Sequence, residues 1–343
     1  MSQKTIMIYA THPICRIILF LDGVFVAGQL LNPWHNIDHL ILIMAENQGP
    51  KFHETCIVCG SSNIKDLKGY EDAFLCKCGN CDMVFVKRIP TLKELDDHYR
   101  NYSYDKEVFV SPVTIARYNE LLDEFEKYRK NNLLLDVGCG VGLFLKVAID
   151  RGWKVFGTEY SDKAIEICEA KGINMKKGVL NAADFNGMQF DVVTSFEVIE
   201  HINNPLAEMK NIETLLRPGG LFYCTTPNFN ALSRYYLKAD YNIIKYPEHL
   251  SFYTPKTLNF LCKKFSLQPL KTLTTGISFS RISGSMNKAA NEPVVGATSK
   301  DEVVRQKIEG NPGLGVLKQL ANVVFNITGT GSALKGYYEK RSP

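Results

Sequence analysis

The sequence predicts an α/β fold built on a doubly wound parallel sheet, and two observations support that prediction. The first is the run Leu133–Gly142, where three apolar residues lead into Asp136 and then into a turn with alternating glycines. The second is the helical pattern Leu143–Arg151 that follows at once, with further strand-like runs after it. In doubly wound folds, a strand, a glycine turn and a helix meet at the carboxyl edge of the sheet, where nucleotides bind.

The other elements of the sheet are expected in chain order. Thr114–Lys130 precedes the glycine turn and has apolar side chains at helical spacing, so it should pack against the sheet. A turn at Pro218-Gly219-Gly220 should introduce the fifth strand. The strands expected after the first helix are Trp153–Glu159, Asn174–Leu180, Phe190–Phe196 and Leu221–Thr225.

The last part of the chain should close the sheet around an insertion. The expected helices are Asn230–Lys238 and Thr254–Phe265, and the expected closing strands are Leu267–Thr275 and Ser332–Glu339, the last antiparallel. The insertion, at about 276–331, begins with a polar stretch and continues with the amphipathic segment Leu314–Ile327. It can serve as a lid over the substrate, as an oligomer contact or as a plain surface helix.

The glycine turn points to a particular kind of ligand. Glycines at Gly138, Gly140 and Gly142 let the backbone approach a ligand closely, and the N–H groups of the following helix can face an anion. A dehydrogenase loop cradles a pyrophosphate with a different glycine spacing. Asp136 directly before the glycines suits a ligand that carries an amino acid, so a dinucleotide oxidoreductase is disfavoured.

The order of these blocks resembles class I S-adenosylmethionine (SAM) methyltransferases, with DVGCGVG as their first motif. The resemblance implies a seven-stranded, Rossmann-like methyltransferase sheet. It also implies that Glu159, an acid about twenty residues past the glycines, accepts hydrogen bonds from the ribose hydroxyls. Val179 stands where relatives carry an acid near the adenine amino group, so that contact should come from backbone or from Asp184. The residues expected to hold SAM are Asp136, Gly138, Cys139, Gly140, Gly142, Glu159, Tyr160, Leu180 and Phe196.

Two cysteine pairs upstream predict a small zinc ribbon. Cys56 and Cys59 form one CxxC knuckle, and Cys78 and Cys81 form a second. Each knuckle can present two thiolates to one tetrahedral zinc ion. Cys76 is either a spare thiol or a replacement for Cys78. Free thiols and disulfides are weaker interpretations of these cysteines. The ribbon can either hold the N-terminal part against the core or line the substrate cleft.

The ribbon followed by a methyltransferase core resembles bacterial enzymes similar to the ubiquinone-biosynthesis O-methyltransferases. In that group an E-x-x-E-H block lies beside the substrate, and here it reads Glu197, Glu200 and His201. The three side chains share a face of a helical turn and can hold a divalent cation, act in catalysis or only brace the loop.

His249 is the first choice for a general base. It lies in a block that recurs in the same group on the substrate side, and a histidine can accept a proton near neutral pH. Tyr246 and Tyr253 are expected as aromatic walls beside it. The alternative is that His249 caps the helix that begins at Thr254.

Composition limits the remaining choices. The 343 residues allow one large and one small domain, and a net charge of +4 without a basic stripe does not favour nucleic acid. Ten cysteines without a secretory signal favour a reducing cytoplasm. Arg16 and Asp22 interrupt the apolar run Ile14–Leu31, which argues against stable membrane insertion.

The expected domains are 1–43, an unassigned leader, 44–105, the ribbon with its linker helix, and 106–343, the methyltransferase core. Met44 is a candidate initiator, with a membrane-touching or interface helix as the alternative for the leader. The expected function is O-methylation of a small metabolite, quinone-like or glycan-precursor acceptor. The alternatives are C-methylation of a nucleotide-activated sugar and a non-catalytic SAM-binding adaptor. The sequence does not indicate an oligomeric state.

Overall fold

The computed structural model describes the backbone of residues 7–11, 14–21 and 24–29 and then residues 50–99, 111–276 and 312–341. The chain divides into two units, Met1–Lys51 and Phe52–Pro343. In the first unit, three strands form an antiparallel sheet in the order β1-β2-β3, where the sequence left open an interface helix. No helix of the described residues is long and apolar enough to cross a bilayer. The strands are β1 (Met7–Thr11), β2 (Ile14–Leu21) and β3 (Val24–Gln29).

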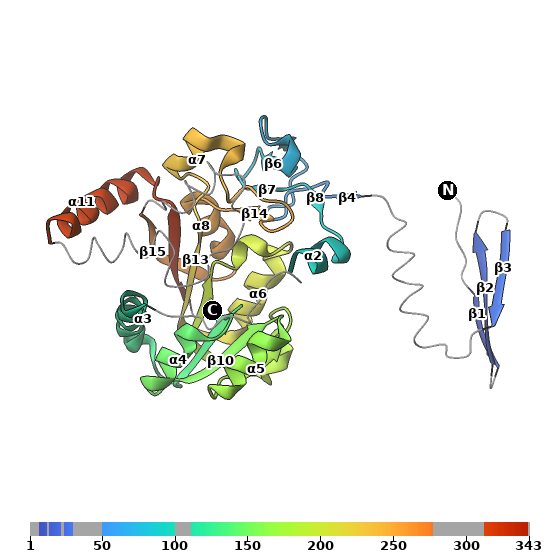
Figure 1. Ribbon diagram of the computed structural model, residues 1–343, viewed down its shortest axis with the longest axis horizontal. Helices are drawn as coiled ribbons and strands as arrows, with labels where there is room; N and C mark the ends of the chain where they lie inside the picture. The colour runs from blue at the N-terminus through green and yellow to red at the C-terminus, as the bar shows by residue number, and fades with distance from the viewer. Residues whose placement is uncertain are drawn as a thin grey trace. The chain divides into compact units, whose positions relative to one another are not determined.

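A seven-stranded sheet forms the centre of the second unit (Figure 1). Its order is β11-β10-β9-β12-β13-β16-β15, and β16 runs antiparallel to both of its neighbours. The pairs from β11 to β13 are all parallel, so the predicted doubly wound sheet with an antiparallel last strand is confirmed. The strands are β9 (Leu133–Val137), β10 (Lys154–Glu159), β11 (Asn174–Lys177), β12 (Phe190–Phe196), β13 (Leu216–Pro227), β15 (Leu267–Thr275) and β16 (Ala333–Lys340).

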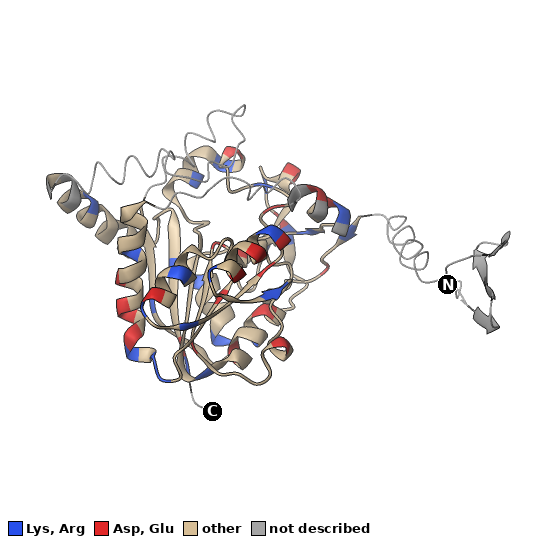
Figure 2. Ribbon diagram, turned by 60° about the horizontal axis from the view of Figure 1, so that its bottom comes forward, with Lys and Arg blue, Asp and Glu red and all other residues tan. Residues whose placement is uncertain are grey.

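Helices cover both faces of this sheet, and each face has its own apolar core. Side chains of α3 (Pro112–Phe125), α4 (Leu143–Asp150) and α5 (Asp162–Ala170) pack together on one face. Those of α6 (Pro205–Leu215) and α8 (Pro255–Lys263) pack on the other. Figure 2 shows charged residues distributed along these helices, as expected for amphipathic helices on a buried sheet.

Local signals explain where these helices begin. Ser111 caps α3 by accepting from the N–H of Thr114, and proline follows at the first helical position. Thr254 and Thr257 form a reciprocal capping box at the start of α8. The expected helix Thr114–Lys130 ends earlier, at Phe125, and continues as a 3₁₀ turn. The 3₁₀ turns are η1 (Glu71–Ala73), η2 (Glu126–Tyr128), η3 (Ala182–Phe185), η4 (Ile199–His201) and η5 (Lys238–Asp240).

Two strand predictions differ from the structure at glycines. Pro218-Gly219-Gly220 is not a turn before the fifth strand but lies within β13, which begins at Leu216. There the pairing shifts from Phe190–Leu216 to Val192–Leu221, so the extra residues form a bulge. The third strand ends at Lys177 instead of Leu180, because Gly178 takes a positive φ of 100° that turns the chain.

The cysteine-rich segment forms a four-stranded sheet with the order β14-β7-β6-β5. Three of its strands lie close together in the chain, but β14 (Ser251–Phe252) comes from the methyltransferase part and pairs antiparallel with β7. The other elements here are β4 (Lys51–Phe52), β5 (Ile64–Asp66), β6 (Leu75–Cys78), β7 (Val84–Val86), β8 (Arg88–Ile89) and α2 (Leu92–Tyr99).

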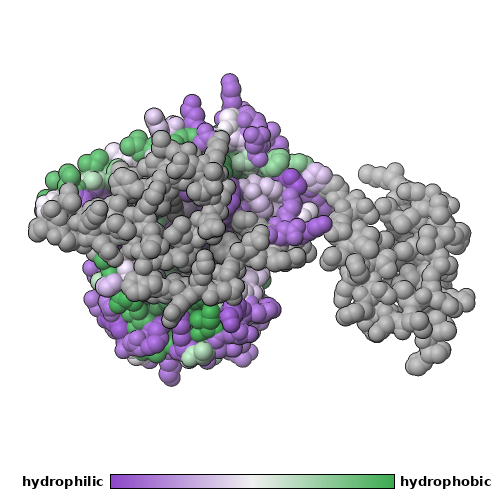
Figure 3. All heavy atoms as spheres, viewed as in Figure 1, coloured by the Kyte–Doolittle hydropathy of each residue, from purple (hydrophilic) through white to green (hydrophobic). Residues whose placement is uncertain are grey.

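The predicted insertion lies only partly within the described residues. Residues 277–311 fall outside them, and the amphipathic segment forms α11 (Pro312–Thr328). Several of its apolar side chains are exposed, and Figure 3 shows green residues at this edge of the molecule. The role of the insertion stays a prediction. The exposed side chains are Val316, Leu317, Leu320, Val323, Val324 and Ile327.

Candidate active site

The glycine turn follows β9 at the carboxyl edge of the sheet, and its three glycines have different surroundings. All three have positive φ. A Cβ on Gly138 would lie 2.7 Å from Val198 Cγ2, and one on Gly142 would lie 2.4 Å from Ile173 Cδ1. A Cβ on Gly140 would meet nothing within 4 Å. Gly138 and Gly142 therefore allow tight packing within the protein, whereas Gly140 borders open space that a ligand can fill.

We expect alanine at Gly142 to lower the stability of the protein and alanine at Gly140 to weaken SAM binding. Gly142→Ala combines a left-handed backbone with a clash in the core, so the free energy of unfolding should fall by about 3 kcal/mol. Gly140→Ala adds only the backbone cost of about 1 kcal/mol but places a methyl group at the ligand surface. Urea unfolding and SAM calorimetry on both variants measure the two effects. Equal loss of stability in both would contradict this assignment.

Asp136 is a buried carboxyl directly below the turn. It is 3% exposed and accepts a hydrogen bond from Thr194 Oγ1 at 2.7 Å. Burial raises the pKa of Asp136 to about 7, the hydrogen bond from Thr194 opposes this, and the charge of Glu159 adds to the rise. A cationic ligand group near this carboxyl would favour its ionised form.

Glu159 ends β10 and is held in place by the backbone. One carboxylate oxygen accepts from the N–H of Gly140 at 3.0 Å, and the other accepts from Tyr160 and Ser161 at 2.7 and 3.2 Å. The acid therefore touches the glycine turn, and its contact with the ribose hydroxyls stays a prediction. Cys139 lies in the same turn, and its N–H donates to Thr158 O at 3.0 Å, which links the turn to β10.

Aromatic side chains of α3 and α4 pack against the end of β12. Phe196, at the end of β12, packs edge-to-face on Phe144, with ring centroids 5.0 Å apart. Tyr118 of α3 lies 6.4 Å from Phe196 by ring centroids. Burial, together with the charge of Asp136, raises the pKa of Tyr118 to about 12. Tyr118 lies in the segment Thr114–Lys130 that the sequence predicted to pack against the sheet, and no motif marks it as a site residue.

The structure brings the three catalytic candidates together. Donor atoms of Glu200, His201 and His249 lie within 4.8 Å of one another, although nearly fifty residues separate the two histidines. Their rings meet edge-to-face, with centroids 4.8 Å apart. Nδ1 of His201 lies 2.7 Å from Glu248 O, and Nδ1 of His249 lies 2.8 Å from Ile243 O.

These contacts fix the tautomers of both rings. A carbonyl oxygen only accepts hydrogen bonds, so each Nδ1 must carry the proton that it donates. In a neutral imidazole, Nε2 then keeps its lone pair, which can take a proton or bind a cation. Both histidines of the cluster are therefore oriented for the same kind of chemistry.

Glu200 completes the cluster from the buried side. It is 2% exposed, accepts from Thr226 Oγ1 at 3.0 Å, and its backbone oxygen accepts from Leu250 N–H at 2.8 Å. Glu197 lies outside the cluster that the described residues form, and its φ of 54° is unusual for a residue with a side chain. The expected cation site at Glu197, Glu200 and His201 thus has a different third candidate, His249.

The surroundings of His249 differ from the prediction at Tyr253. Tyr253 is fully buried in the core on the α6 face, so it cannot form an aromatic wall of an open site. Tyr246 is partly exposed and donates to Glu94 Oε1 at 3.2 Å. His249 does not cap α8 either, because Thr254 caps that helix itself.

The four predicted zinc ligands also converge. Sγ of Cys56 lies 3.5 Å from Sγ of Cys81, and Sγ of Cys59 lies 3.5 Å from Sγ of Cys78. Zinc–sulfur bonds of about 2.3 Å in a tetrahedron require sulfur atoms roughly 3.8 Å apart, so the donor set fits zinc. Cys76 is outside this group and donates instead to Phe85 O at 3.5 Å.

The ribbon is hydrogen-bonded to the segment that carries His249. The N–H of Val86 in β7 donates to Leu250 O at 2.9 Å, next to His249. Lys256 in α8 forms an ion pair with Asp82 in the ribbon at 2.6 Å. Buried side chains of β7 and β14 share one apolar core. The ribbon therefore holds the segment that carries His249.

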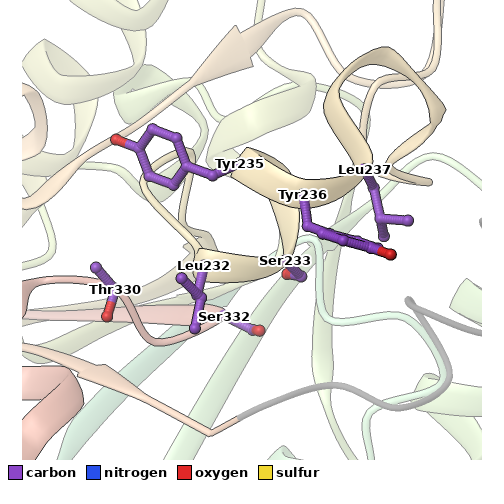
Figure 4. A pocket seen from close by; sticks show the side chains of 7 residues that line it. All are labelled: Leu232, Ser233, Tyr235, Tyr236, Leu237, Thr330 and Ser332. Carbon is purple, nitrogen blue, oxygen red and sulfur yellow. The ribbon is translucent and has the colours of Figure 1, made fainter.

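A cavity of about 550 Å³ opens beside α7 (Leu232–Leu237). Figure 4 shows its lining side chains, which come from α7 and from the segment between α11 and β16. It contains none of the residues predicted to hold SAM and none of the histidine cluster. The lining residues are Leu232, Ser233, Tyr235, Tyr236, Leu237, Thr330 and Ser332.

Known proteins resemble the part of the chain that carries this site. A family model described as a methyltransferase domain matches residues 107–272. The ubiquinone biosynthesis O-methyltransferase of Cereibacter sphaeroides KD131 is 31% identical over 171 residues, which cover 46% of this chain and 68% of that protein. The enzyme of the same name from Ruegeria pomeroyi is 36% identical over 106 residues, 29% of this chain and 43% of that protein.

Solved structures are more distant. A SAM-dependent methyltransferase from Archaeoglobus fulgidus aligns with a TM-score of 0.45 and 18% identity, covering 72% of this chain and 98% of that one.

Proposed function

Because this chain belongs to the SAM-dependent methyltransferase family, we propose that it transfers the methyl group of SAM to a hydroxyl oxygen of a small molecule. The cluster of Glu200, His201 and His249 is the observation that carries this proposal. Oxygen methylation needs a group that removes the hydroxyl proton, whereas a non-catalytic adaptor needs none.

The SAM-binding residues have separable roles. SAM supplies an activated methyl group on a sulfonium, so in-line displacement depends mainly on the position of the acceptor. Glu159 would accept hydrogen bonds from the ribose hydroxyls, and Asp136 would favour the cationic amino-acid end. Gly138 packs against Val198, which links the glycine turn to the segment carrying Glu200 and His201.

The cluster has two possible modes of action. With Nε2 of His249 deprotonated, this ring can take the acceptor proton directly. Alternatively, Glu200, His201 and His249 hold a divalent cation, whose charge favours the ionised acceptor hydroxyl. Two imidazole nitrogens and one carboxylate suit a transition metal that keeps open coordination positions. Substitution of His249 distinguishes the two modes of action.

The acceptor we propose is a quinone-like phenol. The relatives named above act, by name, in ubiquinone biosynthesis. A four-thiolate zinc site needs reduced cysteines, which supports a cytoplasmic location. A glycan precursor and a nucleotide-activated sugar are competing acceptors.

The test combines binding with product analysis. Calorimetry of the zinc-loaded protein should give micromolar or tighter SAM binding. SAM labelled in its methyl group is then incubated with a catechol, a sugar with free hydroxyls and a nucleotide-activated sugar. Label recovered as a phenol methyl ether supports the proposal. A carbon-methylated sugar overturns it, and failure to bind SAM favours the adaptor.

A further inference from the structure

Two cysteines lie together beneath the glycine turn. Cys139 belongs to the turn, Cys168 lies on α5, and their Sγ atoms are 4.0 Å apart. Cys168 is fully buried in the apolar core that α3, α4 and α5 share, whereas Cys139 is partly exposed and packs against that core. Figure 1 shows α5 beside α4 and β10. The pair is separate from the four ribbon cysteines, and no step of the proposed reaction uses it.

The reduced pair supports the part of the turn that borders open space. The thiol of Cys168 donates to Gly140 O at 3.2 Å, and the N–H of Gly140 donates to Glu159 at 3.0 Å. The backbone of Cys139 is in turn bonded to Thr158 O. Gly140 is therefore held between α5 and the end of β10. A change at the two sulfur atoms would reach the surface that is predicted to hold SAM.

The two thiols differ in acidity and in access. The hydrogen bond from Cys139 lowers the pKa of the Cys168 thiol, burial opposes this, and the charge of Lys171 adds to the lowering. A thiolate is the form of cysteine that attacks an oxidant, so Cys168 is the nucleophile of the pair. A small oxidant can reach it through the open space beside Gly140, where Cys139 is partly exposed.

We propose that Cys139 and Cys168 form a reversible disulfide when the protein meets hydrogen peroxide, and that this disulfide closes the SAM site. The inference rests on the proposed SAM site and adds its regulation by oxidation. The sulfur of Cys168 attacks one peroxide oxygen, the O–O bond breaks, and the leaving hydroxide takes up a proton to become water.

The second step forms the disulfide. The sulfur of Cys139 attacks the sulfur of the sulfenic acid on Cys168, and the S–O bond breaks. The second oxygen leaves as water with the proton of the Cys139 thiol. In total the two thiols lose two electrons and two protons, and one hydrogen peroxide becomes two water molecules.

The disulfide would change the shape of the glycine turn. Disulfide sulfur atoms lie about 2 Å apart, so these two must move closer by roughly 2 Å. Because Cys168 is fixed by the core packing of α5, the movement falls on Cys139 and the turn. The reaction also removes the S–H group that donates to Gly140 O. Bound SAM should in return disfavour the disulfide, since coupling between two sites is reciprocal.

The experiment treats the zinc-loaded protein with hydrogen peroxide and maps its non-reduced peptides by mass spectrometry. A linked pair of peptides that contain Cys139 and Cys168 is the expected product. Calorimetry should then show SAM affinity at least about tenfold weaker, and a phosphine reductant should restore it. SAM added before the peroxide should protect the pair. Zinc content is measured in every sample, so that damage to the ribbon is recognised.

Cys168→Ser is the test variant, because a serine hydroxyl can still donate to Gly140 O but cannot form a disulfide. It should bind SAM about as tightly as the unsubstituted protein and keep that affinity after peroxide. Cys76→Ser removes a buried thiol outside the turn and is the matched control. It should stay as sensitive to peroxide as the unsubstituted protein.

The outcomes distinguish this inference from the proposed function. If the reduced protein does not bind SAM, the proposed SAM site is wrong, and so is any regulation of it. If the reduced protein binds SAM, three results overturn the inference alone. The first is that no link between Cys139 and Cys168 forms, and the second is that the link leaves SAM affinity unchanged. The third is that Cys168→Ser loses affinity like the unsubstituted protein, together with its zinc.

Discussion

Replacing His249 with glutamine should lower turnover about 10²- to 10⁴-fold, the usual contribution of a positioned acid or base. The affinity for SAM should stay unchanged, because His249 lies in the cluster with Glu200 and His201 and not in the glycine turn. Steady-state turnover and SAM calorimetry on the same preparation measure both quantities. A variant with full turnover would remove His249 from the mechanism.

The same variant separates the two modes of action. If the cluster holds a cation, a chelator dose that leaves one zinc per chain in the unsubstituted protein should abolish turnover, and Mn²⁺ or Zn²⁺ in excess should partly rescue His249→Gln. If His249 acts as a base, neither treatment should change turnover while the ribbon zinc is retained. The ribbon is expected to hold one zinc ion per chain, so only metal found beyond one zinc per chain is counted as metal in the histidine cluster.

Loss of the ribbon zinc should have the largest effect on stability. Structural zinc binds zinc-finger peptides with about 10–16 kcal/mol of apparent free energy, which is also folding free energy. Cys78→Ser should therefore release the metal and unfold the ribbon. Because β7 pairs with β14 beside His249, turnover should fall with it. Zinc content, thermal unfolding and turnover are the measurements.

Cys76→Ser is the matched control for this prediction. Cys76 lies in the same strand as Cys78 and is equally buried, yet its thiol only donates to Phe85 O, and a serine hydroxyl can do the same. It should keep one zinc and near-normal turnover. If Cys76→Ser loses the metal and Cys78→Ser keeps it, the ligand assignment is wrong.

Much of the sheet could be predicted because its signals are local. Leu133–Gly142 combines a buried strand with a glycine turn, and the strand Leu267–Thr275 is found at its predicted bounds. The ends of strands were harder to predict, because they depend on pairing. The bulge inside β13 reflects how this strand pairs with β12, which the order of residues in one strand does not reveal.

The sequence predicted single residues of the candidate site but not which of them lie together. His249 and His201 were each marked by a motif, but their contact depends on a loop returning to the end of β12. Tyr118 carries no motif at all. Its importance comes from burial beside the charge of Asp136, which appears only when the helices pack on the sheet. Tyr253 shows the converse, since a motif residue turned out to be core.

The pairing of β7 with β14 also bears on how this enzyme can be divided. Removing the ribbon through Ile89 would leave Ser251 and Phe252 as an unpaired edge and would uncover Leu250 and Phe229. Unpaired edges next to apolar surface are templates for aggregation. The methyltransferase part expressed alone should therefore be insoluble, and the smallest productive fragment begins before Cys56.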